Sequence, residues 1–209
     1  TLSSTTPIDD QGNIAIDSNI VLTFSENIKA GTGNIIIKNA AGTTIETIAV
    51  GSGNVVISGS TVTINPTSNL GYATSYNITM ASGVIQDIAG NAYAGISSTS
   101  TLNFTTSAAP DTTNPTLSSA VPADGGANIA VDANIVLTFN EAIAAGTGNI
   151  VIYNSSASAV ATINVLDVTQ ININGTTLTI NPSVTLVNDE AHYVQIAASA
   201  IDDLAGNSY

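Results

Sequence analysis

Two short motifs of this chain carry the side chains best suited to bind a metal ion. The sequence Asp-x-Ala-Gly-Asn occurs at 87–91 and again at 203–207. Each copy offers a carboxylate, an amide oxygen and a glycine that permits a tight turn between them. Ca²⁺ takes about six to eight oxygen ligands from carboxylates, amides and carbonyls in such loops. The motif is compatible with two interpretations: an Asx-type turn in which Asp and Asn only stabilise the loop, and a calcium site.

The motif occurs twice because most of the chain is a repeat. Residues 19–24 and 134–139 both read NIVLTF, and Gly-Thr-Gly-Asn-Ile occurs at 31–35 and 146–150. The repeat unit runs from residue 19 to its match at residue 134. It is longer than a solenoid unit of about 20 to 50 residues and suits a whole small domain. The chain is therefore expected to be a tandem array, which favours reach, spacing or multivalency over chemistry.

The repeat divides the chain into two predicted domains. The first covers 1–106 and the second covers 116–209, and a linker, 107–115, joins them. Pro110 and Pro115 restrict the backbone of this linker and remove donors from it. We expect a short, semi-rigid hinge.

Strands are predicted almost everywhere, because apolar residues alternate with polar ones in short β-branched segments such as 20–24 and 61–64. Gly, Asn, Pro or Ser bounds these segments, and Ser-Gly-Ser at 58–60 and Asn-Gly-Thr at 174–176 suit tight hairpin turns. No segment has a convincing helical period. We predict an all-β chain with two tandem antiparallel β-sandwiches.

The sandwich topology suggests which acids meet. Successive loops alternate between the two ends of a sandwich, so the loop with Glu26 or Glu141 shares an end with the Asp-x-Ala-Gly-Asn loop. In the second domain that end faces the linker, which adds Asp111. With only two Lys and no Arg, a divalent cation is the natural counter-ion. The candidate calcium ligands are Asp111, Glu141, Asp203 and Asn207 in the second domain and Glu26, Asp87 and Asn91 in the first.

The other residues capable of chemistry are expected to be structural. His192 is the only histidine, and it aligns with Tyr76 of the first repeat beside a strand, without a matching nucleophile or oxyanion site. Asp202 and Asp203 could serve glycoside hydrolysis as a pair, but the first repeat has Gln86 in place of Asp202. The chain has no Trp and only 6 Tyr and 3 Phe, so no aromatic platform for a sugar is visible. The sequence therefore predicts no enzyme.

The composition argues against two classes of partner, nucleic acids and membranes. Asp and Glu total 15, Lys and Arg total 2, and the formal net charge is −13. Without a basic patch the chain is not expected to bind nucleic acid, and anionic membranes would repel it. No run of 18 apolar residues exists, so we expect no membrane insertion. The absence of Cys removes disulfides and thiolate sites. Because the chain starts at Thr1 without an initiator Met or signal peptide, it is expected to lie inside a longer precursor.

The combined frame resembles a known family. Five motifs, each present in both repeats, resemble those of the bacterial Ig-like domains of the SbsA type. They are Pro-x-Asp at 7–9 and 122–124, the NIVLTF strands, Gly-Thr-Gly-Asn-Ile, Thr-Ile-Asn-Pro and Asp-x-Ala-Gly-Asn-x-Tyr. These domains occur in S-layer proteins and large repetitive adhesins. The resemblance implies Ig-like sandwiches, a bacterial cell-surface or extracellular location and a non-catalytic structural or adhesive role. The linker segment 111–115 also resembles adhesin joints, some of which bind calcium.

The second repeat stops before its last strand. The first repeat continues from Tyr93 to the strand around 102–106, whereas the counterpart of Tyr93 is Tyr209, the final residue. The second domain is therefore expected to expose a sheet edge and an unfilled core position where Leu102 and Phe104 have no equivalents. A continuation of the chain could fill it, or a neighbouring molecule could supply the strand.

Three functions follow from these observations. The leading one is a spacer or adhesive module of a secreted cell-surface protein, either an S-layer or a repetitive adhesin. The alternative is a self-assembling extracellular filament subunit that uses strand complementation. A carbohydrate-binding module is third, because stacking aromatics are scarce. The expected partners are neighbouring copies or subunits of the same protein, and cell-surface glycans or proteins.

Overall fold

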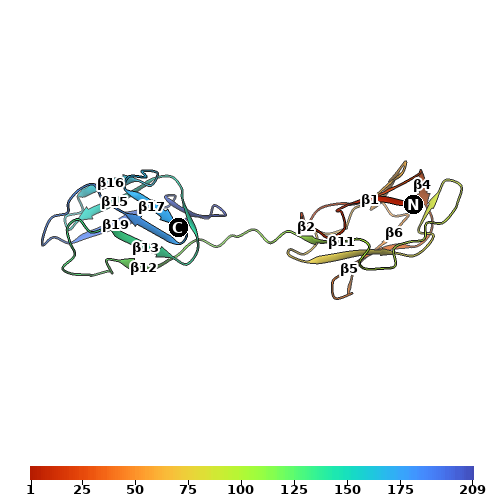
Figure 1. Cartoon of the computed structure of the whole chain (residues 1–209), viewed down its shortest axis with the longest axis horizontal. Helices are drawn as coiled ribbons and strands as arrows, with labels where there is room; N and C mark the ends of the chain where they lie inside the picture. The colour runs from red at the N-terminus through yellow and green to blue at the C-terminus, as the bar shows by residue number, and fades with distance from the viewer. The chain divides into compact units, whose positions relative to one another are not determined.

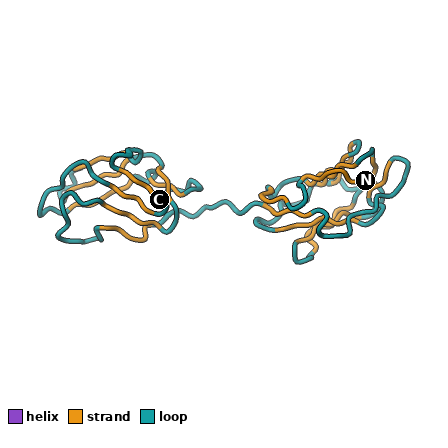
Figure 2. The backbone as a smooth tube through the Cα atoms, viewed as in Figure 1, coloured by secondary structure: helices purple, strands orange, loops and turns teal.

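A computed structural model describes residues 1–209, which form two compact units, Thr1–Ala109 (unit 1) and Pro110–Tyr209 (unit 2). Both units consist of strands and loops (Figure 2), which confirms the all-β prediction. The structure contains no helix that is long and apolar enough to cross a membrane. Residues 107–109 of the expected linker belong to unit 1, and residues 110–115 belong to unit 2.

Unit 1 contains three antiparallel or mixed sheets. One sheet has the strand order β1-β3-β8-β7, a second has β2-β11-β9-β5-β6, and β10 and β4 form a two-stranded ribbon. The strands are β1 (Leu2–Thr6), β2 (Gln11–Ile14), β3 (Ile20–Phe24), β4 (Ile28–Ala30), β5 (Asn34–Asn39), β6 (Thr44–Ala49), β7 (Val55–Ser58), β8 (Thr61–Ile64), β9 (Ser75–Met80), β10 (Ile85–Asp87) and β11 (Asn103–Thr106).

The period-two pattern explains how unit 1 closes its core. Ile20, Leu22 and Phe24 of β3 are buried, while the residues between them are partly exposed. Side chains of a strand alternate between its two faces, so one face of β3 lies entirely in the core. Leu102 and Phe104 enter the same hydrophobic cluster from the second sheet.

β11 is the last strand of unit 1 and is labelled beside β2 in Figure 1. In the sheet it lies between β2 and β9. It pairs in parallel with β2 and antiparallel with β9, with Phe104 opposite Tyr76. The Asp9 carboxylate accepts hydrogen bonds from the backbone and side-chain nitrogens of Asn103, both at 2.9 Å. β11 therefore closes the sheet by backbone pairing on both sides and by two large buried side chains.

Unit 2 repeats most of this arrangement. Its sheets have the orders β12-β13-β18-β17, β14-β20 and β16-β15-β19. The strands are β12 (Leu117–Val121), β13 (Ile135–Phe139), β14 (Ile143–Ala145), β15 (Asn149–Asn154), β16 (Ala159–Asn164), β17 (Ile171–Asn174), β18 (Thr177–Ile180), β19 (His192–Ile196) and β20 (Ile201–Asp203).

The predicted core strand of unit 2 has the expected orientation. Leu137 and Phe139 of β13 are buried, and Ile135 is partly buried against the same cluster. Phe139 meets Tyr209 edge-on at a ring distance of 5.1 Å, which matches the 5.1 Å contact of Phe24 with Tyr93 in unit 1. The repeated sequence therefore builds the same core contact twice.

The units differ at one sheet edge. β19 pairs only with β15, whereas its counterpart β9 pairs with both β5 and β11. Ile14 is 8% exposed beside β11, and its counterpart Ile129 is 45% exposed. This confirms the prediction that the second domain lacks its last strand within residues 1–209.

Candidate metal centre

The turn that follows β20 is built by its own Asp and Asn. Asp203 Oδ1 accepts hydrogen bonds from the backbone N–H groups of Ala205 and Asn207, both at 2.8 Å. Asp203 Oδ2 accepts a third from the Asn207 side-chain amide at 2.7 Å. Gly206 has a φ of 93°, a left-handed conformation that glycine adopts without strain. The motif therefore forms a closed Asx-type turn, as one of the two sequence interpretations expects.

These hydrogen bonds keep Asp203 ionised. The amide of Asn207 and the turn N–H groups lower the pKa of Asp203 below its usual value of 3.8, against a smaller opposing effect of burial. The side chain lies inside the protein, with Asp203 only 4% exposed. Unit 2 thus holds a buried negative charge.

Two further acids lie against this carboxylate. Oxygen atoms of Asp111, Glu141 and Asp203 all lie within 4.8 Å of one another. Ca²⁺–oxygen distances are about 2.3 to 2.6 Å, so two ligands on opposite sides of one ion are about 5 Å apart. The spacing of the three carboxylates is therefore compatible with one shared calcium ion.

The remaining surroundings also favour a cation. The Asn207 side-chain amide donates to the backbone carbonyl of Asp111 at 3.2 Å, which holds that segment beside the turn. An open hollow of about 370 Å³ borders Asp111 and Glu141. Residues 110–209 contain no Lys or Arg. Three carboxylates at this spacing repel one another unless a cation or a proton intervenes. The residues that line the hollow are Asp111, Glu141, Ala142, Leu204 and Ala205.

Unit 1 has the same turn but not the same acid cluster. Asp87 accepts hydrogen bonds from the Asn91 backbone at 2.7 Å and from the Asn91 side chain at 2.6 Å, and these bonds lower its pKa. Glu26 is well exposed and lies 3.8 Å from the terminal ammonium of Thr1. The structure therefore does not bring Glu26, Asp87 and Asn91 together with a third acid, as it does in unit 2.

The charges beside the two turns also differ. In unit 1 Lys29 lies opposite Gln86 in the ribbon, and its ammonium donates to the carbonyl of Ile88 at 3.0 Å. In unit 2 the corresponding pair is Ala144 and Asp202. Unit 2 therefore has the neutral Ala144 in place of the cation Lys29, and the acid Asp202 in place of the neutral Gln86.

His192 lies at the start of β19 and contacts an acid rather than a nucleophile. Its Nδ1 is 3.0 Å from the carbonyl of Glu190, and its Nε2 is 3.8 Å from the Glu190 carboxylate. The Ser155 hydroxyl donates to Glu190 at 3.4 Å and not to the imidazole. This placement matches the expectation of a half-buried strand residue.

The acidic pair of β20 is divided between two faces. Asp203 lies with the cluster, whereas Asp202 accepts a hydrogen bond from the Ser208 hydroxyl at 2.5 Å. Consecutive strand residues point to opposite sides of a sheet. The two carboxylates therefore cannot act from both sides of one glycosidic bond.

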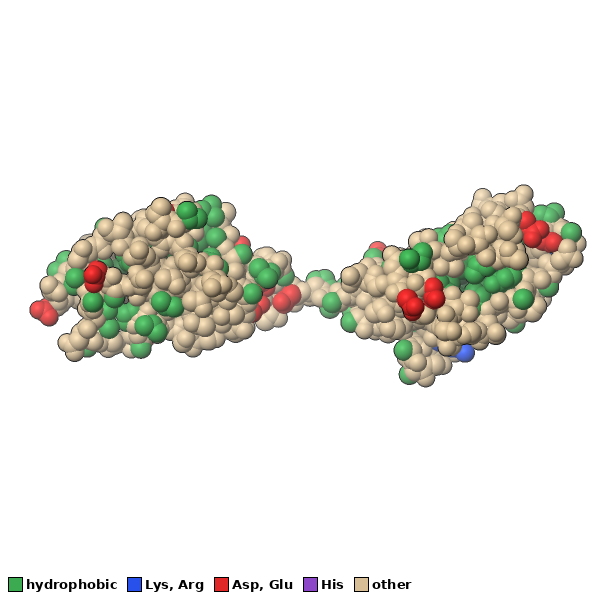
Figure 3. Space-filling view, in the orientation of Figure 1, with side chains coloured by type: hydrophobic (Ala, Val, Ile, Leu, Met, Phe, Trp, Pro, Cys, Tyr) green, Lys and Arg blue, Asp and Glu red, His purple; other side chains and the backbone are tan.

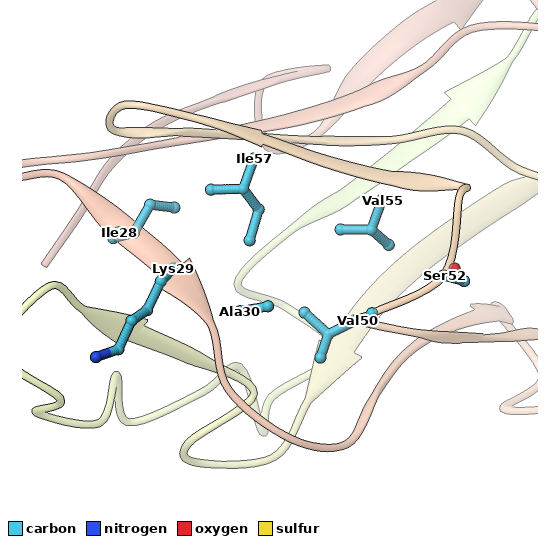
Figure 4. A pocket seen from close by; sticks show the side chains of 8 residues that line it. Ile28, Lys29, Ala30, Val50, Ser52, Val55 and Ile57 are labelled. Atoms are coloured by element: carbon cyan, nitrogen blue, oxygen red, sulfur yellow. The ribbon is translucent and has the colours of Figure 1, made fainter.

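Two surface features were not predicted from the sequence. Unit 1 has an open hollow of about 410 Å³ between β4 and β7, where Figure 4 shows Ile28, Val50 and Val55 around one space. In unit 2 the rings of Tyr153 and Tyr193 stack at 5.1 Å. Most of the visible surface is neither charged nor hydrophobic (Figure 3), as the Ser-, Thr- and Asn-rich composition requires.

Comparisons with known proteins cover both units. A family model described as a bacterial Ig-like domain matches residues 1–106 and 111–209. A solved structure of the BSP domain of a biofilm-associated protein aligns with 92% of this chain at 17% identity and a TM-score of 0.23. The aligned region is 27% of that structure's chain. A search of curated proteins gave no match.

Proposed function

Since the chain belongs to the bacterial Ig-like domain family and carries two copies of that domain, we propose that it is a non-catalytic structural or adhesive module of a secreted bacterial cell-surface protein. In finer terms, the module is a spacer of an S-layer or a repetitive adhesin, in line with the SbsA-type resemblance of its motifs. Its partners are neighbouring copies or subunits of the same protein and cell-surface glycans or proteins.

The tandem arrangement of two separate cores is the observation that supports this proposal most. Each unit has its own hydrophobic cluster, built from the same repeated strands. Two separately folded domains in series suit a surface protein that must hold another part away from the cell. The low content of Lys and Arg also leaves few cleavage sites for trypsin-like proteases.

Antibodies against residues 1–209 test the location directly. They should label intact, unpermeabilised cells of the bacterium that produces the protein, and treatment of those cells with a nonspecific protease should remove the label. Labelling that appears only after lysis would contradict a cell-surface role. An antibody against a cytoplasmic protein of the same cells is the control for cell integrity.

The acid cluster of unit 2 supports a structural role for calcium within this function. Asp111, Glu141 and Asp203 supply the carboxylate oxygens, and Asn207 holds Asp111 beside Asp203 through its amide. An ion there would join the segment before β12 to the turn after β20. It would therefore fix the beginning of unit 2 to its last turn and stiffen the module.

The alternative function is a self-assembling extracellular filament subunit. The unpaired edge of β19 favours it, because an unpaired edge is a template for strand addition from another copy. Light scattering and electron microscopy of the purified chain test this alternative. Filaments that disappear in a Val194→Asp variant would support it, and a chain that stays monomeric at high concentration would contradict it.

A further inference from the structure

We propose that Asn174 is a site of spontaneous modification, at which its side-chain amide is lost through a cyclic imide formed with the Gly175 nitrogen. Asn-Gly occurs once in the chain, at 174–175. Most other asparagines precede Ile, Val or Pro. A β-branched side chain crowds the nitrogen that must attack, and proline has no N–H there. The inference concerns the chemistry of unit 2 and does not rest on the proposed function.

The hairpin turn between β17 and β18 holds the two reacting groups at the surface. Asn174 lies opposite Thr177 at the end of the strand pairing, so Gly175 and Thr176 form a two-residue turn. Gly175 has a φ of 59°, as the first residue of a type II′ hairpin turn does. Asn174, Gly175 and Thr176 are all exposed. Water therefore reaches the whole turn.

No other group occupies the nitrogen of Gly175. Its N–H donates no backbone hydrogen bond, whereas its carbonyl accepts one from the N–H of Ile143 at 2.9 Å. A Cβ placed on Gly175 would have no atom within 4 Å. In unit 1 the corresponding position on Gly59 has the side-chain oxygen of Asn27 at 3.6 Å. The turn of unit 2 is therefore open to a side chain that folds back onto the backbone.

Hydrogen bonds hold the side chains of the two asparagines that precede a serine. Asn154 accepts a hydrogen bond from the N–H of Ser158 at 2.9 Å. Asn207 donates its side-chain amide to Asp203 at 2.7 Å. No such bond fixes the side chain of Asn174, so its amide is free to approach the next nitrogen along the chain.

The reaction needs only water as a co-reactant. The Gly175 nitrogen forms a bond to Cγ of Asn174, the Cγ–Nδ2 bond breaks, and the proton of the attacking N–H leaves with Nδ2 as ammonia. Water then opens the five-membered imide at one of its two carbonyl carbons. Opening at the side-chain carbonyl gives aspartate, and opening at the main-chain carbonyl gives isoaspartate, whose backbone runs through the former side chain. No atom is oxidised or reduced.

Both products change unit 2. Each adds a carboxylate to a unit that contains no Lys or Arg. Isoaspartate also lengthens the backbone between β17 and Gly175 by one methylene group, which disturbs the pairing of Asn174 with Thr177. Ile171 of β17 belongs to the hydrophobic core of unit 2. The modification should therefore loosen the β17–β18 hairpin at one edge of its sheet.

Incubation of the folded chain at mildly alkaline pH, followed by peptide mapping with mass spectrometry, tests the proposal. The peptide that contains Asn174 should gain the mass that exchange of NH2 for OH produces, and chromatography should separate its aspartate and isoaspartate forms. Conversion there should exceed conversion at every other asparagine. A sample digested without incubation corrects for conversion during the digestion. After conversion, hydrogen exchange at the amides of β17 and β18 should become faster.

The first repeat supplies matched variants. Unit 1 has Ser58 before Gly59 in the same hairpin turn, so Asn174→Ser copies a turn that this fold already contains. That variant should show no mass gain at position 174. Ser58→Asn should create a second reactive site in unit 1, with slower conversion because the Asn27 side chain lies beside that turn.

Three results would overturn the proposal. The first is conversion of Asn174 in urea but not in the folded chain, because the hairpin would then hold the side chain away from the Gly175 nitrogen. The second is equal conversion at several asparagines of the folded chain. The third is unchanged exchange in β17 and β18 after conversion, which would remove the structural consequence. None of these results concerns the cellular location, so the proposed function is tested separately.

Discussion

At the scale of single residues, hydrogen bonds to Asp203 and Asp87 give both copies of the loop motif the same structural role. Each carboxylate closes its turn by accepting backbone and side-chain N–H groups from the Asn four positions later. These bonds need the ionised form of the acid, and they lower the pKa of both groups. The motif therefore forms the same turn in both units. In unit 2 alone, two further acids, Asp111 and Glu141, lie close to the Asp of that turn.

The lowered pKa values make stability depend on pH. The unfolded chain takes up protons at a higher pH than the folded turn, so folding stability is present above the usual pKa of 3.8 and is lost as pH falls through the folded-state pKa. Urea unfolding followed between about pH 5 and 2 should show this loss. An Asp203→Asn chain should lose less stability on acidification. Equal slopes for the two chains would contradict the assignment, and Asp132→Asn is the matched control.

Calcium should stabilise unit 2 through the acid cluster. A ligand that binds only the folded state at 100 times its dissociation constant adds about 2.7 kcal/mol to the free energy of unfolding. The thermal midpoint of unit 2 should therefore be higher in millimolar calcium than in chelator. Glu141→Gln should remove the increase, whereas Glu26→Gln, at the corresponding position of unit 1, should keep it. Identical midpoints with and without calcium would leave the turn as the sole role of the motif.

At the scale of elements, β11 accounts for most of the difference between the units. It supplies two pairing edges and the buried side chains of Leu102 and Phe104 in unit 1. In unit 2 Val194 and Ile196, the counterparts of the buried Ile78 and Met80 of β9, are only partly buried. A single strand thus decides whether the second sheet of the sandwich is closed.

Removal of the central side chain of β11 should weaken unit 1 alone. Phe104→Ala deletes a fully buried ring, which costs about 3 to 5 kcal/mol in a well-packed core. Hydrogen exchange at the amides of β9 should then become faster, while exchange in unit 2 stays the same. Ile88→Ala, at a residue that is 61% exposed, is the control. An unchanged β9 would show that β11 does not hold this edge.

Much of the fold was predictable from the sequence, and the reasons lie in particular strands. NIVLTF alternates strictly, so the buried faces of β3 and β13 follow from period two alone. The convergence of Asp111 with Glu141 and Asp203 was expected from the alternation of loops, and the structure places them within 4.8 Å. The hollow between β4 and β7 and the stacking of Tyr153 on Tyr193 depend on packing between distant segments, which the sequence pattern does not encode.

At the scale of the whole molecule, the two units should differ in stability. Burial of two side chains such as Leu102 and Phe104 contributes about 3 to 6 kcal/mol before ordering costs. Unit 2 lacks this contribution, so it should unfold first. Limited proteolysis with a nonspecific protease should release a resistant fragment that corresponds to residues 1–109. A fragment that corresponds to unit 2 would contradict this order.

The central claim is that two independently folded sandwiches act as a mechanical spacer. Single-molecule stretching of the chain between its ends tests this most directly. The account predicts two separate unfolding steps, each releasing about 30 nm at about 3.4 Å per residue, with unit 2 yielding at the lower force. Smooth extension without steps, or one step that releases both units together, would contradict it.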